Sequence, residues 1–267
     1  MNLFYSIKLY LMIIYKEAQR FFTYRANIFA GLISAVLILA ARFALWHSLF
    51  ATGNAQVATF EDTMTFFVIN DILILWIAAS YSNYIGPDVA SGDIVYRLMK
   101  PASYHLQLIA LSHARAFIST ITRSLPMFIF AVIFIDLIFP TVIVFMAFLL
   151  VAILGGIIYS LLDLIISYTV FWLTEYWYVS WFKRAIFALF GGLALPLWFY
   201  PEWLRSISEL LPFQFAIFVP VELYLGRIPV SDIGAILLIQ LFWIAVLFLC
   251  ERLIWKWAQR KLIIQGG

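Results

Sequence analysis

Six long apolar stretches constrain the fold of this chain more than any other feature. Lipid offers the backbone no hydrogen-bond partners, so a chain crosses a bilayer as helices or as a closed barrel. The stretches are continuous rather than alternating with a period of two, which indicates helices. A helix needs about 20 residues to cross roughly 30 Å of hydrocarbon. We therefore predict an all-α integral membrane protein with six transmembrane helices, at 26–50, 62–86, 112–139, 141–167, 184–200 and 231–252.

The composition agrees, because 65% of the residues are hydrophobic and only 12% are charged. Six spans place both termini on one side of the membrane. Lys and Arg gather in short cytoplasmic loops, and 14 of the 17 bases fall on the side of the termini, which we therefore predict to be cytoplasmic. Arg205 and Arg227 lie outside, and Arg42 lies within span 1. The 14 bases are Lys8, Lys16, Arg20, Arg25, Arg97, Lys100, Arg115, Arg123, Lys183, Arg184, Arg252, Lys256, Arg260 and Lys261.

Residues 1–25 form an amphipathic helix at the membrane surface in our prediction, not a seventh span. A period of 100° per residue separates an apolar from a polar face. The apolar face carries Leu3, Phe4, Ile7, Leu11, Ile14, Ala18, Phe21 and Phe22; the polar face carries Asn2, Lys8, Lys16, Gln19, Arg20 and Thr23. Leu9, Met12 and Ile13 interrupt the polar face, which indicates contact with protein as well as lipid. A simple anchor and a mechanical role both remain open.

A compact charged stretch follows span 2. Gly86-Pro87-Asp88 can end one helix and begin another, because Pro suits the first helical position and Asp complements the positive helix end. Pro101 disfavours the α conformation in the residue before it, so the new helix must end near there. We predict a short amphipathic cytoplasmic helix over 87–101; the alternative is a solvated turn without a partner. Its apolar side would carry Ile94, Val95, Leu98, Met99, Ala102 and Leu106, away from Asp93, Arg97 and Lys100.

The outer connection between spans 5 and 6 is divided by Pro196, Pro201, Pro212 and Pro220 into aromatic-rich pieces too short to cross the bilayer. We predict an extracellular re-entrant hairpin over 201–225; an ordinary interfacial loop is the alternative. Aromatic side chains suit the headgroup level, and apolar ones would face inward. The former are Trp198, Tyr200 and Trp203, and the latter are Ile207, Leu210 and Leu211.

Two charges lie well inside the predicted spans. Lipid rejects such charges unless they are paired or line a wet path. Arg42 lies 8 residues before the end of span 1 and Asp71 lies 9 residues into span 2. At 1.5 Å per residue both are roughly 12 to 14 Å below the outer surface. Sequential antiparallel spans are usually neighbours, so we predict an ion pair. The alternative is that each faces the translocation path or another subunit.

The sequence lacks the motifs of common catalytic sites. It contains no Gly-x-x-x-x-Gly-Lys-Ser/Thr phosphate loop and no Gly-x-Ser-x-Gly elbow. His47, His105 and His113 are scattered, and Cys250 is alone, so no metal site is predicted. The net charge of +3 follows from the loop asymmetry and does not indicate nucleic acid. We predict that the chain is not an enzyme and binds no cofactor itself.

Three segments together resemble the permease subunit of type-2 ATP-binding-cassette (ABC) exporters. Ser91-Gly92-Asp93-Ile94 through Leu98-Met99-Lys100-Pro101 is similar to the family's "SGDI…LLKP" element, with Met99 where leucine is usual. Gly191-Gly192 through Pro196, then Phe199 through Leu204 and Leu211-Pro212-Phe213, resembles its "G…P…FPEWL…LPF" hairpin. Tyr24-Arg25-Ala26-Asn27 and the final Gln265-Gly266-Gly267 resemble an uncharacterised bacterial branch. The resemblance extends over the whole chain.

This resemblance implies a connecting helix over 1–25 and a single six-span domain over 26–267. A cytoplasmic coupling helix over 87–101 would dock on a dimer of ABC ATPase subunits, which bind ATP and Mg²⁺. A second permease, identical or homologous, would complete the path in the bacterial cytoplasmic membrane. The residues implied in ATPase coupling are Asp88, Gly92, Asp93, Arg97, Lys100 and Pro101. Those implied in the outer gate are Gly191, Gly192, Pro196, Pro201, Trp203 and Pro212.

The leading hypothesis is an exporter permease, whose aromatic outer hairpin and few buried charges favour lipid-like, peptide or drug-like cargo. A secondary transporter is the alternative. It needs intramembrane ionisable groups that couple to an ion gradient, and Arg42 and Asp71 are the two candidates well inside the membrane. A membrane-embedded enzyme ranks below both, since no histidine or carboxylate constellation is present.

Overall fold

A computed structural model of the chain describes residues 11–12, 15–16, 19, 25–53, 57–77, 80–100, 102–173 and 176–265. The predicted helix over 1–25 falls almost wholly outside these residues, as does Pro101. The described part is helical and contains no strand. Its helices are α2 (Arg25–Ala51), α3 (Phe60–Ile77), α4 (Ser82–Ser91), α5 (Ile94–Leu98), α6 (Tyr104–Ser119), η1 (Thr120–Ser124), α7 (Leu125–Phe134), α8 (Val142–Ser167), η2 (Tyr168–Trp172), α9 (Trp177–Phe190), η3 (Leu197–Phe199), α10 (Glu202–Leu210), α11 (Phe213–Ala216), α12 (Phe218–Tyr224), η4 (Val230–Asp232) and α13 (Ile233–Gln265).

Five helical stretches in the described part are long and apolar enough to cross a membrane. Their surfaces carry many exposed large apolar side chains, such as Leu37 on α2 and Leu238 on α13. Such a surface suits hydrocarbon rather than water. The prediction of an all-α, multi-pass membrane protein is therefore confirmed. The five stretches are Phe29–Ala51, Phe60–Ser91, Tyr104–Phe134, Val142–Trp172 and Val230–Lys261.

The region of the fifth predicted span, 184–200, is not one continuous helix. Helix α9 covers Trp177–Phe190, and its 14 residues fall short of the roughly 20 that cross a bilayer. It ends at Gly191, and Gly192 then adopts a φ of +73°, which glycine tolerates without strain. Six membrane crossings and the bilayer position of the hairpin that follows remain predictions.

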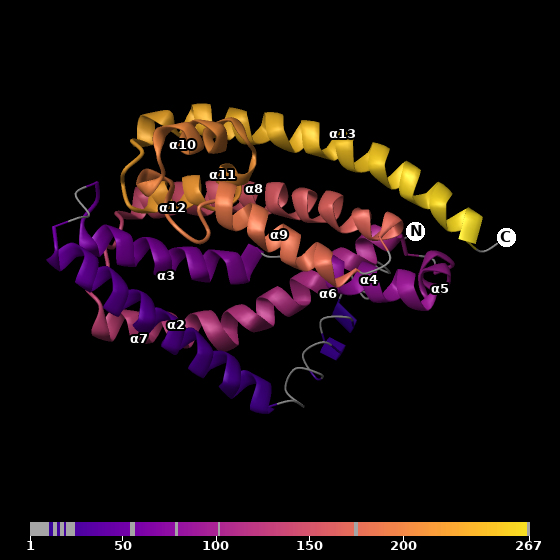
Figure 1. Cartoon of the computed structure of the whole chain (residues 1–267), viewed down its shortest axis with the longest axis horizontal. Coiled ribbons are helices and arrows are strands. Elements are labelled where there is room, and N and C mark those ends of the chain that lie inside the picture. Colours follow the sequence, from indigo (N-terminus) through magenta and orange to yellow (C-terminus); the bar gives the residue numbers. More distant parts are fainter. Residues whose placement is uncertain are drawn as a thin grey trace.

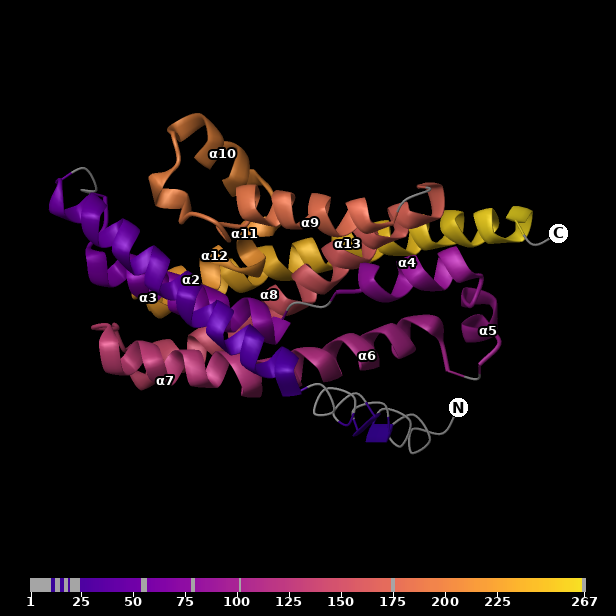
Figure 2. The ribbon, with the colours of Figure 1, turned by 60° about the horizontal axis from the view of Figure 1, so that its bottom comes forward.

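The helices form an elongated bundle (Figures 1 and 2). Helices α4 and α5 lie at one end, which we call the α5 end, together with the end of α13. Helix α10 and the end of α2 lie at the other, the α10 end. Helix α9 returns along α8 from α4 to α10 and α11 (Figure 1).

The core lies where α8 meets α3, α12 and α13. Helices α11 and α12 are buried against α8, and Ala216 and Ile217 are inaccessible. Gly155 of α8 permits this approach, because a Cβ there would lie 2.8 Å from the Phe215 carbonyl oxygen. Gln240 Nε2 donates to the carbonyl oxygens of Val151, at 3.0 Å, and Phe215, at 3.1 Å. The later part of the 201–225 segment is therefore fixed inside the bundle.

Candidate functional site

The charged stretch after α3 folds as two helices, not as the single predicted helix over 87–101. Pro87 does not begin a helix but lies inside α4. Its fixed φ suits a helix, and its missing N–H removes one hydrogen bond. The break lies at Gly92, whose φ of +79° caps the end of α4. Glycine adopts this left-handed conformation without a steric penalty.

Asp88 and Arg97, two predicted coupling residues, bind each other. Arg97 Nε lies 2.7 Å from Asp88 Oδ2, and the Tyr104 hydroxyl donates to the same oxygen at 3.1 Å. Asp88 is buried, so its carboxylate faces the protein rather than a partner. Gln107 Nε2 donates to the carbonyl oxygens of Arg97 and Ala102, at 3.0 and 2.9 Å. These contacts connect α4, α5 and the start of α6.

The outer face of α5 is exposed and partly apolar. Tyr96 is 70% exposed and Met99 78% exposed, and Val95 beside them is exposed too. The predicted coupling residues Asp93 and Lys100 are also exposed. We call these five residues the α5 tip.

The apolar side predicted for this segment is wrong for Val95, Leu98 and Met99, which are exposed, and right for Ile94 and Ala102, which are buried. A five-residue helix has a little over one turn and turns few side chains toward the bundle. Tyr96 was not singled out by the sequence.

Four side chains tie the α5 end to the rest of the bundle: His105, Tyr168, Glu251 and Trp255, which we call the His105 cluster. His105 Nε2 lies 2.8 Å from Glu251 Oε1, and the Tyr168 hydroxyl donates to this oxygen at 2.8 Å. Trp255 packs edge-on to His105 and stacks on Tyr104. The cluster joins α6, η2 and α13. Sequence reasoning missed it, although a lone Glu251 near the end of span 6 was a signal.

The structure brings Arg42 and Asp71 together. Arg42 Nη1 lies 2.7 Å from Asp71 Oδ2, inside the distance that an ion pair requires, and the side chains are 24% and 21% exposed. The guanidinium also lies 4.8 Å from the centre of the Phe67 ring. The pair joins α2 to α3.

A second ion pair is more completely buried than Arg42–Asp71. Lys183 Nζ is 2.7 Å from Asp163 Oδ1, and Asp163 is fully buried. Asp163 also accepts hydrogen bonds from the Tyr81 backbone N–H, at 2.9 Å, and from the Ser167 hydroxyl, at 3.3 Å. Sequence reasoning placed Lys183 in a cytoplasmic loop and missed this pair. It holds α9, α8 and the start of α4 together.

At the α10 end, the predicted gate residues occupy turns and helix ends. Gly191 and Gly192 end α9, and Pro201 and Pro212 precede α10 and α11. Pro196 precedes η3. The Asn70 amide donates to the Leu193 carbonyl oxygen at 3.1 Å and so ties this turn to α3.

Helix α10 presents Trp203, Ile207 and Leu210 on one exposed face. The inward orientation predicted for Ile207 and Leu210 is therefore wrong. The prediction rested on side-chain type, which does not determine what a helix face contacts. Trp198, predicted at the headgroup level, is instead buried beneath Arg227, 4.2 Å from its ring centre.

Arg227 lies between two carboxylates, with Asp62 Oδ2 at 3.7 Å and Glu222 Oε1 at 3.6 Å. Burial raises the pKa of Glu222 to about 7, although the charge of Arg227 acts in the opposite direction. This group therefore titrates near neutral pH.

Comparison with known proteins places the chain in a family. No curated protein and no solved structure matches it. The family model described as "ABC-2 family transporter protein" matches residues 36–266, which include the α5 tip, the Arg42–Asp71 and Lys183–Asp163 ion pairs and the hairpin segment. This match confirms the resemblance found in the sequence, and the chain belongs to the ABC-2 family of membrane transport proteins.

Proposed function

We propose that this chain is the permease subunit of an exporter driven by ATP, which a separate ABC ATPase subunit hydrolyses with Mg²⁺. The observation that carries the proposal is the α5 tip. Exposed aromatic and Met side chains are enriched in protein interfaces, and here they lie beside Asp93 and Lys100 at one extremity of the bundle. The ATPase dimer would dock there. The α5 end then faces the cytoplasm, as the distribution of bases predicts.

Movement at the tip would reach the membrane helices through the contacts behind it. The Arg97–Asp88 ion pair links α5 to α4, and the Tyr104 hydroxyl links α4 to α6. The His105 cluster continues this path to α13. A lever needs a rigid connection of this kind. At the α10 end, the segment from Gly191 to Tyr224 would gate the outer side of a path shared with a second permease, identical or homologous.

Copurification tests the proposal. Tagged permease drawn from its native membranes should retain a protein with a phosphate-loop motif and ATPase activity. Tyr96→Ala and Met99→Ala should each lower the amount retained by about tenfold, the effect of losing roughly 1.4 kcal/mol at an interface. Tyr178→Ala, which removes another exposed tyrosine, on α9, serves as the control. ATPase retention unchanged by Tyr96→Ala and Met99→Ala would refute docking at the tip.

A secondary transporter is a second candidate, which the buried Lys183–Asp163 pair and the half-buried Arg42–Asp71 pair favour. Intramembrane ionisable groups commonly carry ions or protons. Transport into vesicles that contain the permease alone, driven by an imposed pH gradient and abolished by Asp71→Asn, would support this alternative.

A further inference from the structure

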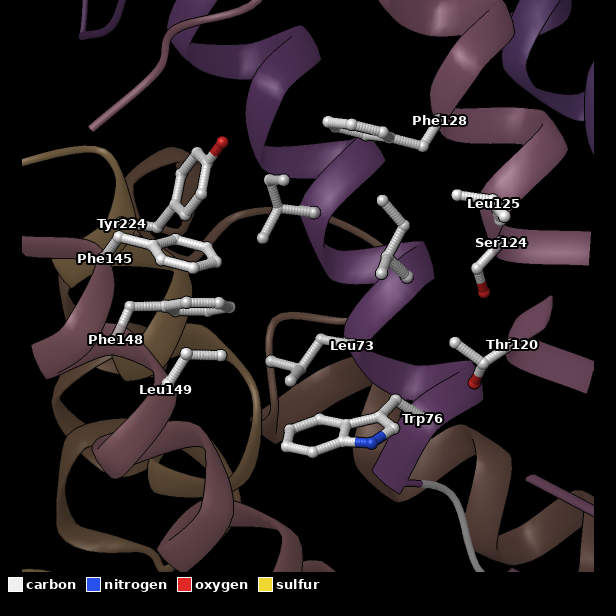
Figure 3. Close-up of a pocket in the computed structure, with 12 residues that line it drawn as sticks. Leu73, Trp76, Thr120, Ser124, Leu125, Phe128, Phe145, Phe148, Leu149 and Tyr224 are labelled. Carbon is white, nitrogen blue, oxygen red and sulfur yellow. The ribbon is translucent and has the colours of Figure 1, made fainter. Parts of the chain in front are cut away.

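An apolar groove runs along the side of the bundle. Leu73 and Trp76 of α3 lie between two walls in Figure 3. One wall comes from η1 and α7, and the other from α8 with Tyr224 of α12. The cavity has a volume of about 300 Å³. Its wall residues are Thr120, Ser124, Leu125, Phe128, Phe145, Phe148 and Leu149.

A second cavity of about 420 Å³ continues the groove toward the α5 end. Trp76 lines both cavities and divides the groove. Ile109 lines the second cavity and Phe128 the first, on one unbroken helical path from α6 to α7. The two residues are 19 positions apart, which corresponds to about 28 Å at 1.5 Å per residue, close to the thickness of the hydrocarbon core. The second cavity also contains the more polar residues His113 and Ser160.

Among the residues that line the first cavity, one fully buried side-chain oxygen has no hydrogen-bond partner in the described structure. The Thr120 hydroxyl donates to the Ala116 carbonyl oxygen at 2.9 Å and is satisfied. Ser124 is 1% exposed, and its hydroxyl oxygen makes no hydrogen bond within the described structure. Buried polar groups are nearly always paired, so an orphan requires an explanation. Ser124 also lies in η1, a π-helical turn, and such turns are frequent at functional sites.

We propose that this groove binds one acyl chain of a membrane amphiphile that enters sideways from the bilayer. The walls and floor belong mainly to three of the five candidate spans, so the medium beside the groove is hydrocarbon. The headgroup points toward the His113 and Ser160 compartment, the ester oxygens lie past Trp76 beside Ser124, and the acyl chain continues toward Phe128. The Ser124 hydroxyl donates to an ester or hydroxyl oxygen of the amphiphile. That this amphiphile is cargo rests on the proposed function, but its binding does not.

The test uses full-length permease alone, in phosphatidylglycerol vesicles that contain a trace of the same lipid with a photoactivatable diazirine on one ester-linked acyl chain. After illumination and digestion, mass spectrometry locates the label. We expect the label to concentrate on residues 120–128 and 145–149 relative to the exposed face of α13. Leu149→Trp should fill the groove and lower this ratio at least about fivefold. Leu238→Trp, on the exposed face of α13, should leave it unchanged.

Ser124→Ala keeps the groove open and tests the polar contact. It should lower the labelling ratio about two- to tenfold, the effect of one hydrogen bond. Ser112→Ala is the matched control, because that hydroxyl donates to the Leu108 carbonyl oxygen of its own helix at 2.8 Å. This variant should keep the wild-type ratio.

Equal labelling of all exposed helix faces would overturn the proposal, since it would identify ordinary surrounding lipid. So would a ratio that Leu149→Trp leaves unchanged in protein that is folded by size-exclusion chromatography. Cross-links between two permease copies across the groove would instead identify a protein interface. None of these results depends on the ATPase, so each is distinguishable from a failure of the ATPase to copurify.

Discussion

Replacement of Lys183 by Met tests how strongly α9 depends on one buried ion pair. Its ammonium group lies 2.7 Å from Asp163, and the two side chains are 8% and 0% exposed. Removing one partner of a buried pair leaves an uncompensated charge and costs about 3–5 kcal/mol. Asp163 would retain the Tyr81 N–H and the Ser167 hydroxyl. We therefore expect a loss near the lower limit, about 3 kcal/mol of unfolding free energy.

A double variant separates the energy of the ion pair itself from that of the other contacts of Lys183 and Asp163. Asp163→Asn removes the charge but keeps an oxygen that accepts the Tyr81 N–H. Alone, it should also cost about 3 kcal/mol, because it strands the Lys183 ammonium. Combined with Lys183→Met it leaves no buried charge, so the total loss should fall to about 1–2 kcal/mol. The coupling energy between the two sites should then be about 4–5 kcal/mol, well above the error of additivity for distant sites.

Unfolding of the purified protein in mixed lipid–detergent micelles, followed by tryptophan fluorescence against denaturant, provides these free energies. Arg184→Met is the matched control, because Arg184 is the next base on α9 and is exposed. It should change stability by less than about 0.5 kcal/mol. Single-variant losses that add, or that do not exceed the Arg184→Met loss, would refute the argument.

Three further predictions follow from other sites. Arg42→Leu and Asp71→Leu should each lower the unfolding free energy in the same assay. Their coupling energy should be about 1–2 kcal/mol, smaller than for Lys183–Asp163 because this pair is more exposed. Losses that simply add would exclude coupling. Burial raises the pKa of Glu222 from 4.5 to about 7, so the folded state favours the neutral carboxyl group. The stability that this group contributes, on the order of 3 kcal/mol, is fully present below pH 4.5 and is lost as the pH rises through 7. Glu222→Gln should remove this loss between pH 5 and 8, whereas Glu209→Gln on α10 should keep it. Gly92→Ala should lower ATPase retention with little loss of folded yield, since its φ of +79° costs another residue about 1–2 kcal/mol.

The sequence was sufficient where one physical requirement determined the answer. Continuous apolar stretches predicted the long helices, because lipid leaves the backbone no alternative. Depth matching placed Arg42 near Asp71, since consecutive antiparallel spans are usually neighbours. Lys183 and Asp163 lie on α9 and α8, two long helices that are separated only by the short η2. They escaped prediction because α9 begins at Trp177 and not at residue 184, so Lys183 was assigned to a loop.

The spacing of apolar residues along a helix did not determine whether they face the protein interior or the outside. The α10 face that carries Trp203, Ile207 and Leu210 has the helical spacing expected of an inward face but is exposed. Within α5 the helix is too short for a period to form. Asp88 and Arg97 are charged residues in a charged stretch, and only the tertiary structure shows that they bind each other.

Exposed apolar side chains have different consequences in two parts of this structure. On α13 they cover a candidate membrane span, where hydrocarbon surrounds them at no cost. Tyr96 and Met99 follow the end of the Phe60–Ser91 span, between the charged Asp93 and Lys100. Apolar area left in water costs roughly 25 cal/mol per Å². The Asp88–Arg97 pair and Gln107 fix the segment from behind, so it cannot turn these side chains inward. A fixed, exposed apolar surface past the end of this candidate span is the strongest physical support for the proposal that a protein partner docks at the α5 tip.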